Sequence, residues 1–344
     1  MFDPTKPFKD LPLLPPAADL ETKPVLRACI EARAALAELN QAGALLPNQA
    51  MLINTVPLLE AQSSSAIENI VTTSDRLFRF AEVARGVEID PTTKEALRYR
   101  TALWHGVELL ESRPLSTATA VGVCRELLGI DIDIRRVPGT ALANESTGKL
   151  IYTPPVSEEL LRELLSNWEK FLHNLLFLVD EGLLEIPVLY LSRHILSHRD
   201  AYYRSLRQVT ANHNWEDWTL FMLKAVHETA RWTADRIRRI RQLAEDTNSY
   251  IREELPRIYT HELAELIFVQ PYSRIRNVVE AGIAQGQTAA VYLKRLAEIG
   301  VLEELQAGRE KIFINLRLMH LLTQEDSGPL TFEPPVSLPA RIVL

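Results

Sequence analysis

The stretch EAQSSSAIENIVTTSDRLF, residues 60–78, decides how the first half of this chain is interpreted. Its run of three serines combines poor helix formers with good capping residues, so a helix is predicted to begin at Ser64 or Ser65. On that helix Ser64 and Glu68 lie four residues apart and share one face, and Asn69 follows directly. Taken alone, this is the pattern of a helix cap, which needs no further function.

Helical periodicity extends to both sides of this stretch. The proline-rich residues 1–24 predict an extended arm along the surface, because proline is excluded from helix interiors. Residues 25–255 predict a helical domain, in which Pro57 must bend or break one helix. The predicted helices cover 25–39, 48–61, 75–84, 93–110, 117–128, 158–172, 183–209, 215–243 and 248–258. The fold class is therefore predicted to be all-α.

Residues 139–155, GTALANESTGKLIYTPP, depart from this helical pattern. Two short β-favouring runs flank the polar turn NESTG, which predicts a β-hairpin with Gly148 in a positive-φ conformation. A lone hairpin in a helical protein has no sheet to join. Its edge could accept an extended segment of another protein, or the hairpin could be a stabilising surface ribbon.

The pattern changes again at residues 256–322. Three short helices separated by turns, followed by two alternating strands, are the element order of a winged helix. In such folds the third helix commonly enters the DNA major groove, where it would offer Gln287, Thr288, Lys294 and Arg295. Within this region eight Lys and Arg face seven Asp and Glu, which favours protein contact or dimerisation over DNA binding. A proline-rich tail, 323–344, follows.

Composition limits the class of protein. The 344 residues are 47% hydrophobic with a net charge of −7, which suits a globular protein and argues against a general polyanion binder. Cys29 and Cys124 form no spaced pair, so neither a disulfide framework nor a zinc site is expected, and a reducing compartment fits best. The longest apolar run, 175–179, is too short to span a bilayer. We expect a cytoplasmic protein without membrane contact.

Familiar catalytic motifs are missing from the sequence, which contains no G-x-x-x-x-G-K-[ST], G-x-G-x-x-G, H-E-x-x-H or G-x-S-x-G. His194 and His198 lie four residues apart on a predicted helix and could share a metal ion. Without a third His or a matching carboxylate, packing or solvent-exposed histidines are the better interpretation. The residues alone therefore assign no catalytic residue and no metal ligand.

Taken in order, these parts resemble the Fic proteins, which are protein adenylyltransferases. SSSAIEN matches their inhibitory motif [ST]-x-x-x-E-[GN] at residues 64–69, and VPGTALANESTGKLIYTPP looks like their target-docking flap. The region after residue 256 is similar to the C-terminal winged-helix domain of one bacterial subgroup. The resemblance implies an all-α Fic-like helical bundle over 25–255 with a small β-hairpin flap at 139–155, plus the winged helix.

The same resemblance implies an activity. Fic proteins transfer AMP from ATP, with Mg²⁺, to a hydroxyl side chain of a target protein. In this chain inhibition would run through Ser64, Glu68 and Asn69. The target protein would dock on the flap at Thr140, Ala141, Leu142, Lys149, Leu150 and Ile151, and a homodimer is expected.

One part of the family pattern is missing from this chain. The signature H-P-F-x-[DE]-G-N-G-R-x-x-R belongs between the helix ending FLH and the helix beginning NLLFLV, but His173 is followed directly by Asn174. In the family, the His of this signature is the general base, the acidic residue holds Mg²⁺ and the Gly-rich turn with its Arg binds the ATP phosphates. The resemblance therefore predicts an inactive member that has lost its ligands for ATP and Mg²⁺, and in which Glu68 has lost its Arg partner. The alternative is a winged-helix transcriptional regulator, or a target-binding protein, on an inactive Fic scaffold.

The join itself allows two interpretations. Apolar positions on both sides share one helical face, so a single helix across His173 and Asn174 is geometrically possible. Phe177 and Leu178 lie off that face, as in a buried helix. The join is therefore interpreted as two helices of one site brought end to end by loss of the loop.

Overall fold

The computed structural model describes residues 3–46, 50–67, 73–80, 90–112, 115–137, 139–143, 147–171, 182–185, 188–307 and 310–323. These residues are mostly helical and include two small antiparallel sheets, so the all-α class and the small hairpin are confirmed. Among the helices of these segments, none combines the length and the apolarity needed to cross a lipid bilayer.

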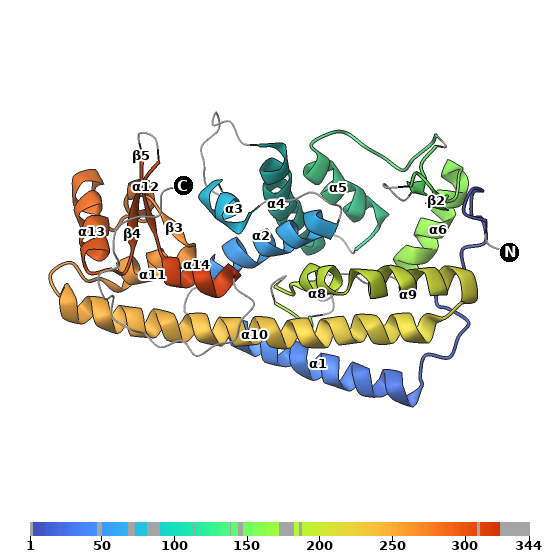
Figure 1. The fold of residues 1–344 in the computed structure, drawn as a ribbon, viewed down its shortest axis with the longest axis horizontal. Coiled ribbons are helices and arrows are strands. Elements are labelled where there is room, and N and C mark those ends of the chain that lie inside the picture. Colours follow the sequence, from blue (N-terminus) through green and yellow to red (C-terminus); the bar gives the residue numbers. More distant parts are fainter. Residues whose placement is uncertain are drawn as a thin grey trace.

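Two long helices, α1 (Lys23–Ala44) and α10 (Trp215–Glu254), lie side by side along one edge of the molecule (Figure 1). Alanine and leucine side chains at helical spacing on α1 are buried in the core that the two helices share. At the surface of this contact, the Glu38 carboxylate pairs with the Arg238 guanidinium at 2.5 Å. The helix pair forms the base on which the shorter helices are stacked.

α10 is one helix of 40 residues where two helices, 215–243 and 248–258, were predicted. The break between them does not occur, and the prediction is wrong at this point. Leu243, Thr247 and Ile251 recur every four residues and are all buried on the same face. Because this buried face continues through the polar segment, packing keeps the segment helical.

α2 (Ala50–Ile67) continues through Pro57 without a break. Proline removes one helical hydrogen bond and crowds the preceding turn. The neighbouring side chains of Val56, Leu58 and Leu59 are all buried, and their packing keeps this turn in place.

Three helices lie above α2 in Figure 1: α3 (Ser74–Phe80), α4 (Pro91–Ser112) and α5 (Thr117–Leu128). α5 has the predicted bounds, because both of its ends carry strong capping residues. The Ser116 side chain accepts a hydrogen bond in the first turn, and Gly129 ends the helix with φ of +69°.

The predicted hairpin consists of β1 (Leu142–Ala143) and β2 (Leu150–Tyr152), which pair antiparallel. Gly148 has φ of +64°, as predicted for its turn. α6 (Glu158–Phe171) follows the hairpin. The join after it, residues 172–181, lies outside the described residues.

α8 (Leu191–Ser197) and α9 (Arg199–Asn212) replace the single helix predicted over 183–209. The predicted start is too early, because residues 182–185 and 188–190 are not helical and α8 begins at Leu191. At His198 the backbone leaves helical geometry, with φ of −123° and ψ of 33°, and this separates the two helices.

The region after residue 256 contains the three helices and two strands that were predicted there. The helices are α11 (His261–Val269), α12 (Ile275–Glu280) and α13 (Gly286–Glu298). The strands are β4 (Glu303–Ala307) and β5 (Glu310–Ile314), paired antiparallel.

Two further elements complete this region. β3 (Tyr272–Ser273) pairs with β5 and gives the sheet order β3-β5-β4. This strand was not predicted, because two residues are too few to show an alternating pattern in the sequence. α14 (Leu316–Thr323) returns to α10, where Arg236 donates a hydrogen bond to the Leu321 carbonyl at 2.9 Å. One continuous hydrophobic core joins these elements to α1, α2 and α10.

Candidate functional site

The serines of the inhibitory-like motif lie in the last turns of α2, so the prediction that a helix begins at Ser64 or Ser65 is wrong. The packed face of α2 carries the helix past them, and the hydroxyls of Ser63 and Ser64 bond to other elements instead of capping a helix. The buried Ser63 hydroxyl lies 2.6 Å from that of Tyr190, and Ser64 hydrogen-bonds to the Tyr99 phenol. The described residues do not include the other two motif positions, Glu68 and Asn69.

One turn before these serines, Glu60 is buried, with 5% of its surface exposed. Its carboxylate accepts hydrogen bonds from the Ser192 amide at 3.1 Å and from the Ser192 hydroxyl at 2.5 Å. Burial raises the pKa of Glu60 to about 7, and the two hydrogen bonds oppose this shift. Sequence reasoning missed this group, although a lone carboxylate among buried apolar positions of a helix is a usable signal.

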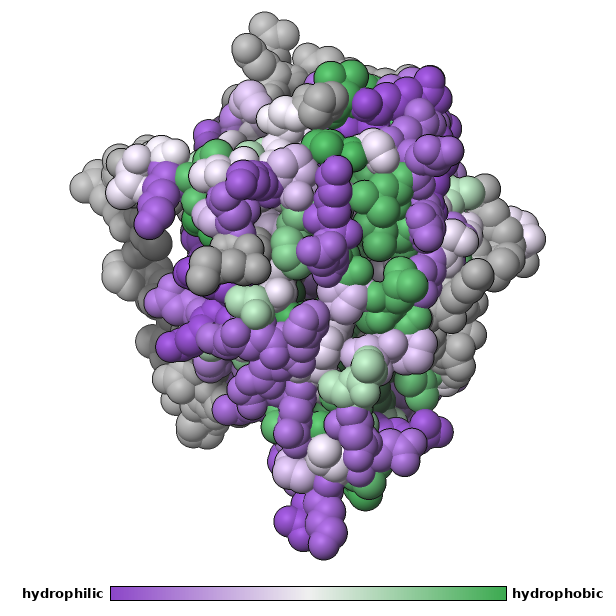
Figure 2. Space-filling view, turned by 90° about the vertical axis from the view of Figure 1, so that its right-hand side faces the viewer, coloured by the Kyte–Doolittle hydropathy of each residue, from purple (hydrophilic) through white to green (hydrophobic). Residues whose placement is uncertain are grey.

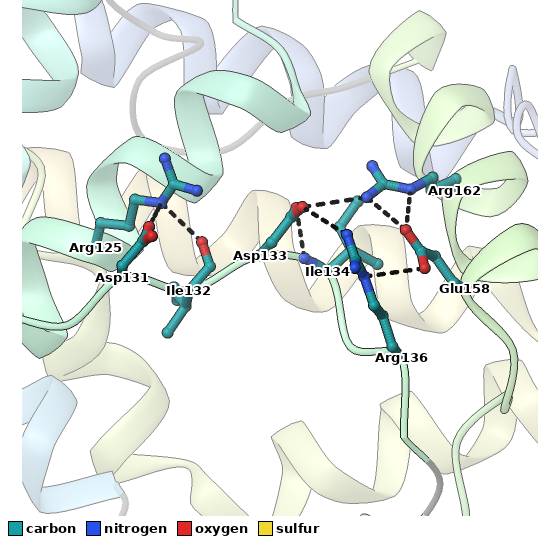
Figure 3. Close-up of polar contacts among 8 residues, drawn as sticks. All are labelled: Arg125, Asp131, Ile132, Asp133, Ile134, Arg136, Glu158 and Arg162. Carbon is teal, nitrogen blue, oxygen red and sulfur yellow. Dashed lines mark hydrogen bonds and ion pairs between the residues drawn. The ribbon is translucent and has the colours of Figure 1, made fainter.

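An ion-pair cluster ties together the segments before and after the hairpin (Figure 3). Asp133 lies 3.2 Å from Arg162, Arg162 lies 2.8 Å from Glu158, and Glu158 lies 3.1 Å from Arg136. The amide of Ile134 donates to Asp133 and, as the main cause, lowers the pKa of this carboxyl group. Each exposed pair contributes little alone. Together the four side chains connect the two ends of the hairpin at its base.

The six residues predicted to dock a target lie on or beside this hairpin. Leu150 is half-buried, and the other five are exposed: Thr140, Ala141, Leu142, Lys149 and Ile151. Two of them are apolar side chains with substantial exposure, 51% for Leu142 and 40% for Ile151. Figure 2 views the molecule from the end that carries the hairpin, where hydrophobic residues reach the surface among hydrophilic ones.

A cleft of about 980 Å³ lies between α5, the segment 129–134 and α6. Several of its charged side chains have polar partners. Arg125 lies 3.0 Å from Asp131, and Glu169 accepts a hydrogen bond from the Thr117 amide. Of these, only Arg125 and Asp131 form a pair of opposite charges; the Glu169 carboxylate is held by a neutral main-chain amide.

Binding of ATP with Mg²⁺ would require clustered oxygen ligands and a phosphate-binding loop. Within the described ranges, no three His, Cys, Asp or Glu side chains gather in one place. The buried carboxylate of Glu60 is held by Ser192 and does not line the cleft. The described residues therefore do not fit Mg²⁺ and ATP.

His194 and His198 share one side of the chain, as their spacing predicted, and their rings stack at 4.2 Å. His194 is buried, and its Nδ1 atom lies 3.2 Å from the Glu228 carboxylate on α10. Burial lowers the pKa of His194, and the neighbouring His198 lowers it further. These contacts agree with the packing interpretation.

The residues proposed for DNA contact lie on one exposed face of α13: Gln287, Thr288, Lys294 and Arg295. Arg295 pairs with Glu298 at 2.8 Å, which neutralises half of the positive charge on this face. Val291, between them, is 52% exposed. The exposed Glu303 and Glu304 lie on the neighbouring strand β4, so the surface is mixed in charge.

Comparison with known proteins finds two matching domains. Residues 26–108 match the domain described as Fic/DOC family N-terminal, and residues 243–318 match the C-terminal domain of SoFic-like protein adenylyltransferases. Among solved structures, a crystal structure of a Fic family protein from Desulfovibrio desulfuricans G20 is 15% identical, with a TM-score of 0.43. That alignment covers 87% of this chain and 98% of the other. The hairpin and the join lie between the two matched domains.

Proposed function

Because the chain belongs to the Fic family, with matching domains near both ends, we propose that it is a target-binding protein on a Fic scaffold that does not transfer AMP. At the level of the family, membership supports a function of the protein-AMPylation type. The observation that carries the proposal is the direct step from His173 to Asn174, which leaves the whole signature H-P-F-x-[DE]-G-N-G-R out of the sequence.

The chemistry explains why this loss removes activity. In the resembled family the signature supplies the general base, the Mg²⁺ ligand and the phosphate-binding turn. Loss of one such group typically lowers a rate by about two to four orders of magnitude. The described residues include no cluster of three His, Cys, Asp or Glu side chains that could replace the lost ligands. In active members, bound ATP would supply the AMP group and Mg²⁺ would neutralise its phosphates. In this chain the function that remains is to bind a target protein.

Transfer of AMP tests the first half of the proposal. The purified chain is incubated with Mg²⁺ and ATP labelled at the α-phosphate, alone and with a cell extract, beside an active Fic protein and beside the extract without the chain. We expect no label on the chain and none on other proteins beyond that of the extract alone, and no ATP binding by calorimetry. Label that survives a denaturing gel would overturn the proposal.

Binding at the flap tests the second half. Its exposed apolar residues Leu142 and Ile151 are the surface that an extended target segment would cover. A protein that binds there should be lost from the double variant Leu142→Asp, Ile151→Asp. It should be retained by Leu45→Asp, which changes an equally exposed leucine at the end of α1. Equal binding by both variants would count against the flap.

The alternative function is a winged-helix regulator that binds DNA through α13. The exposed Lys294 and Arg295 favour it, whereas the nearby acids Glu298, Glu303 and Glu304 oppose phosphate contact. We expect no mobility shift with random duplex DNA at low salt. A salt-sensitive shift that Lys294→Ala and Arg295→Ala abolish would favour the regulator. The exposed Val291 suits a contact with another protein instead of DNA. If that protein is a second copy of the chain, sedimentation should detect a homodimer.

A further inference from the structure

The N-terminal arm contacts the hairpin directly. The amide of Phe8 donates a hydrogen bond to the Thr153 carbonyl at 2.9 Å, and the Thr153 hydroxyl donates to the Pro4 carbonyl at 2.7 Å. Figure 1 shows the arm near the N-terminal label, beside β2 and α6. One hairpin residue is thus held at both its main chain and its side chain by the arm.

A turn in the arm makes this double contact possible. Lys6 donates its amide to the Asp3 carbonyl at 3.2 Å, and the Asp3 side chain accepts from both the amide and the hydroxyl of Thr5. This Asx-type turn reverses the chain between Pro4 and Phe8. The Pro4 carbonyl and the Phe8 amide therefore face the same residue of the hairpin, although three residues separate them.

Aromatic packing accompanies the hydrogen bonds. The rings of Phe8 and Tyr152 lie 6.2 Å apart in a tilted arrangement, and both side chains are half-buried. Burial of Tyr152 also raises its pKa. The arm thus covers the end of β2, whereas Leu142 and Ile151 of the same hairpin remain exposed.

A second anchor fixes the far end of this segment. The Leu14 amide donates to the Asn167 side-chain oxygen at 2.7 Å, and the Asn167 side-chain amide donates to the Leu14 carbonyl at 2.8 Å. Through these two bonds the Asn167 side chain on α6 satisfies both main-chain polar groups of Leu14, as a neighbouring strand would. Beyond them, Thr22 donates to Glu216 and ties the arm to α10. These contacts hold the arm close to the hairpin.

We propose that residues 3–14 are a built-in ligand of the flap, which an extended target segment must displace before it can pair along β2. Thr153 directly follows β2, so a strand added to that edge would need the Thr153 main-chain carbonyl that the Phe8 amide now uses, and would displace Pro4 from the Thr153 hydroxyl. A short tether gives the arm an effective concentration of about millimolar, so a free peptide competes poorly. That the segment excluded by the arm belongs to a target protein rests on the proposed function. That the arm contacts the end of β2 does not.

Hydrogen exchange of the full-length protein tests the contact itself. Thr153→Val removes only the hydroxyl bond to Pro4 and should speed exchange at Phe8 by about fivefold. Phe8→Ala keeps the main-chain amide but removes the aromatic packing on Tyr152, and should speed exchange in both the arm and β2 by on the order of tenfold. Leu13→Ala changes an exposed residue of the same arm and should leave both unchanged. Unchanged exchange in Thr153→Val and Phe8→Ala would overturn the proposal.

Competition tests the consequence. The probe is a fluorescein-labelled peptide with the sequence of residues 3–14, DPTKPFKDLPLL. We expect binding to the Phe8→Ala protein, whose own arm is loosened, and at least about tenfold weaker binding to the unaltered protein. Equal binding to both, or binding to neither at millimolar peptide, would overturn the proposal. Neither assay involves AMP transfer or a target, so the proposed function can fail while this inference stands, and the reverse.

Discussion

The carboxylate of Glu60 on α2 accepts hydrogen bonds from both the amide and the hydroxyl of Ser192 at the start of α8. The two residues are 132 positions apart in the chain. This contact links the helix that carries the motif serines to the helix that follows the join. Because Glu60 is buried, its protonation state affects the stability of this part of the fold.

The first prediction concerns pH. The pKa of Glu60 is about 7 in the folded protein and 4.5 as an ordinary carboxyl group. The folded state therefore holds a proton that the unfolded state has released, and stability is lost as pH rises through this window. Between pH 5.5 and 8.5 the loss should be about 2 kcal/mol. The unfolding free energy, measured with urea at each pH, should fall in the unaltered protein but not in Glu60→Gln. If the unfolding free energies of the two proteins change with pH in parallel, the prediction is wrong.

The second prediction concerns the partner side chain. Ser192→Ala removes the hydroxyl bond, which now stabilises the ionised carboxylate of Glu60. Above pH 8 the variant should lose about 1.5–3 kcal/mol of unfolding free energy, as expected for a hydrogen bond to a charged group. The pKa of Glu60 should rise further, so the pH at which stability falls moves upward. A variant with an unchanged pH midpoint would show that the hydroxyl bond is not made.

The third prediction concerns the end of α5. Gly129 has φ of +69°, and a Cβ there would meet the Arg98 guanidinium at 3.2 Å. Gly129→Ala should cost about 1–2 kcal/mol for the left-handed backbone, and more because Arg98 also donates to the Leu128 carbonyl and must move. Gly148→Ala is the matched control, since it has φ of +64° but no atom within 4 Å of its added Cβ. Equal losses would exclude the Arg98 contact as a cause.

The fourth prediction concerns the start of α14. The buried side chain of Asn315 accepts from the Leu318 amide at 3.0 Å and donates to the Ile267 carbonyl at 3.2 Å. Asn315→Ala should lower the unfolding free energy by about 2–3 kcal/mol, because it removes a helix cap and leaves a buried carbonyl unpaired. Asn315→Ser keeps the cap acceptor and should recover part of the loss. Thermal unfolding of both variants checks this order.

Local signals in the sequence account for the elements that were predicted well. α5 has its predicted ends because Ser116 and Gly129 are strong caps, and the hairpin has its predicted turn because Gly148 tolerates positive φ. Errors arose where tertiary packing overrode a local signal. The serines near the end of α2 look like the start of a helix, yet the packed face of α2 carries the helix past them.

The sequence by itself determined the family resemblance, the helical class and the direct step from His173 to Asn174, because each depends on residues close together in the chain. Only the tertiary structure decided that Glu60 meets Ser192 and that Phe8 meets Thr153. Periodicity and capping act over a few residues, whereas these contacts join segments more than a hundred residues apart. Such pairs form only when helices pack, because burial and main-chain pairing then select which distant polar groups must satisfy each other.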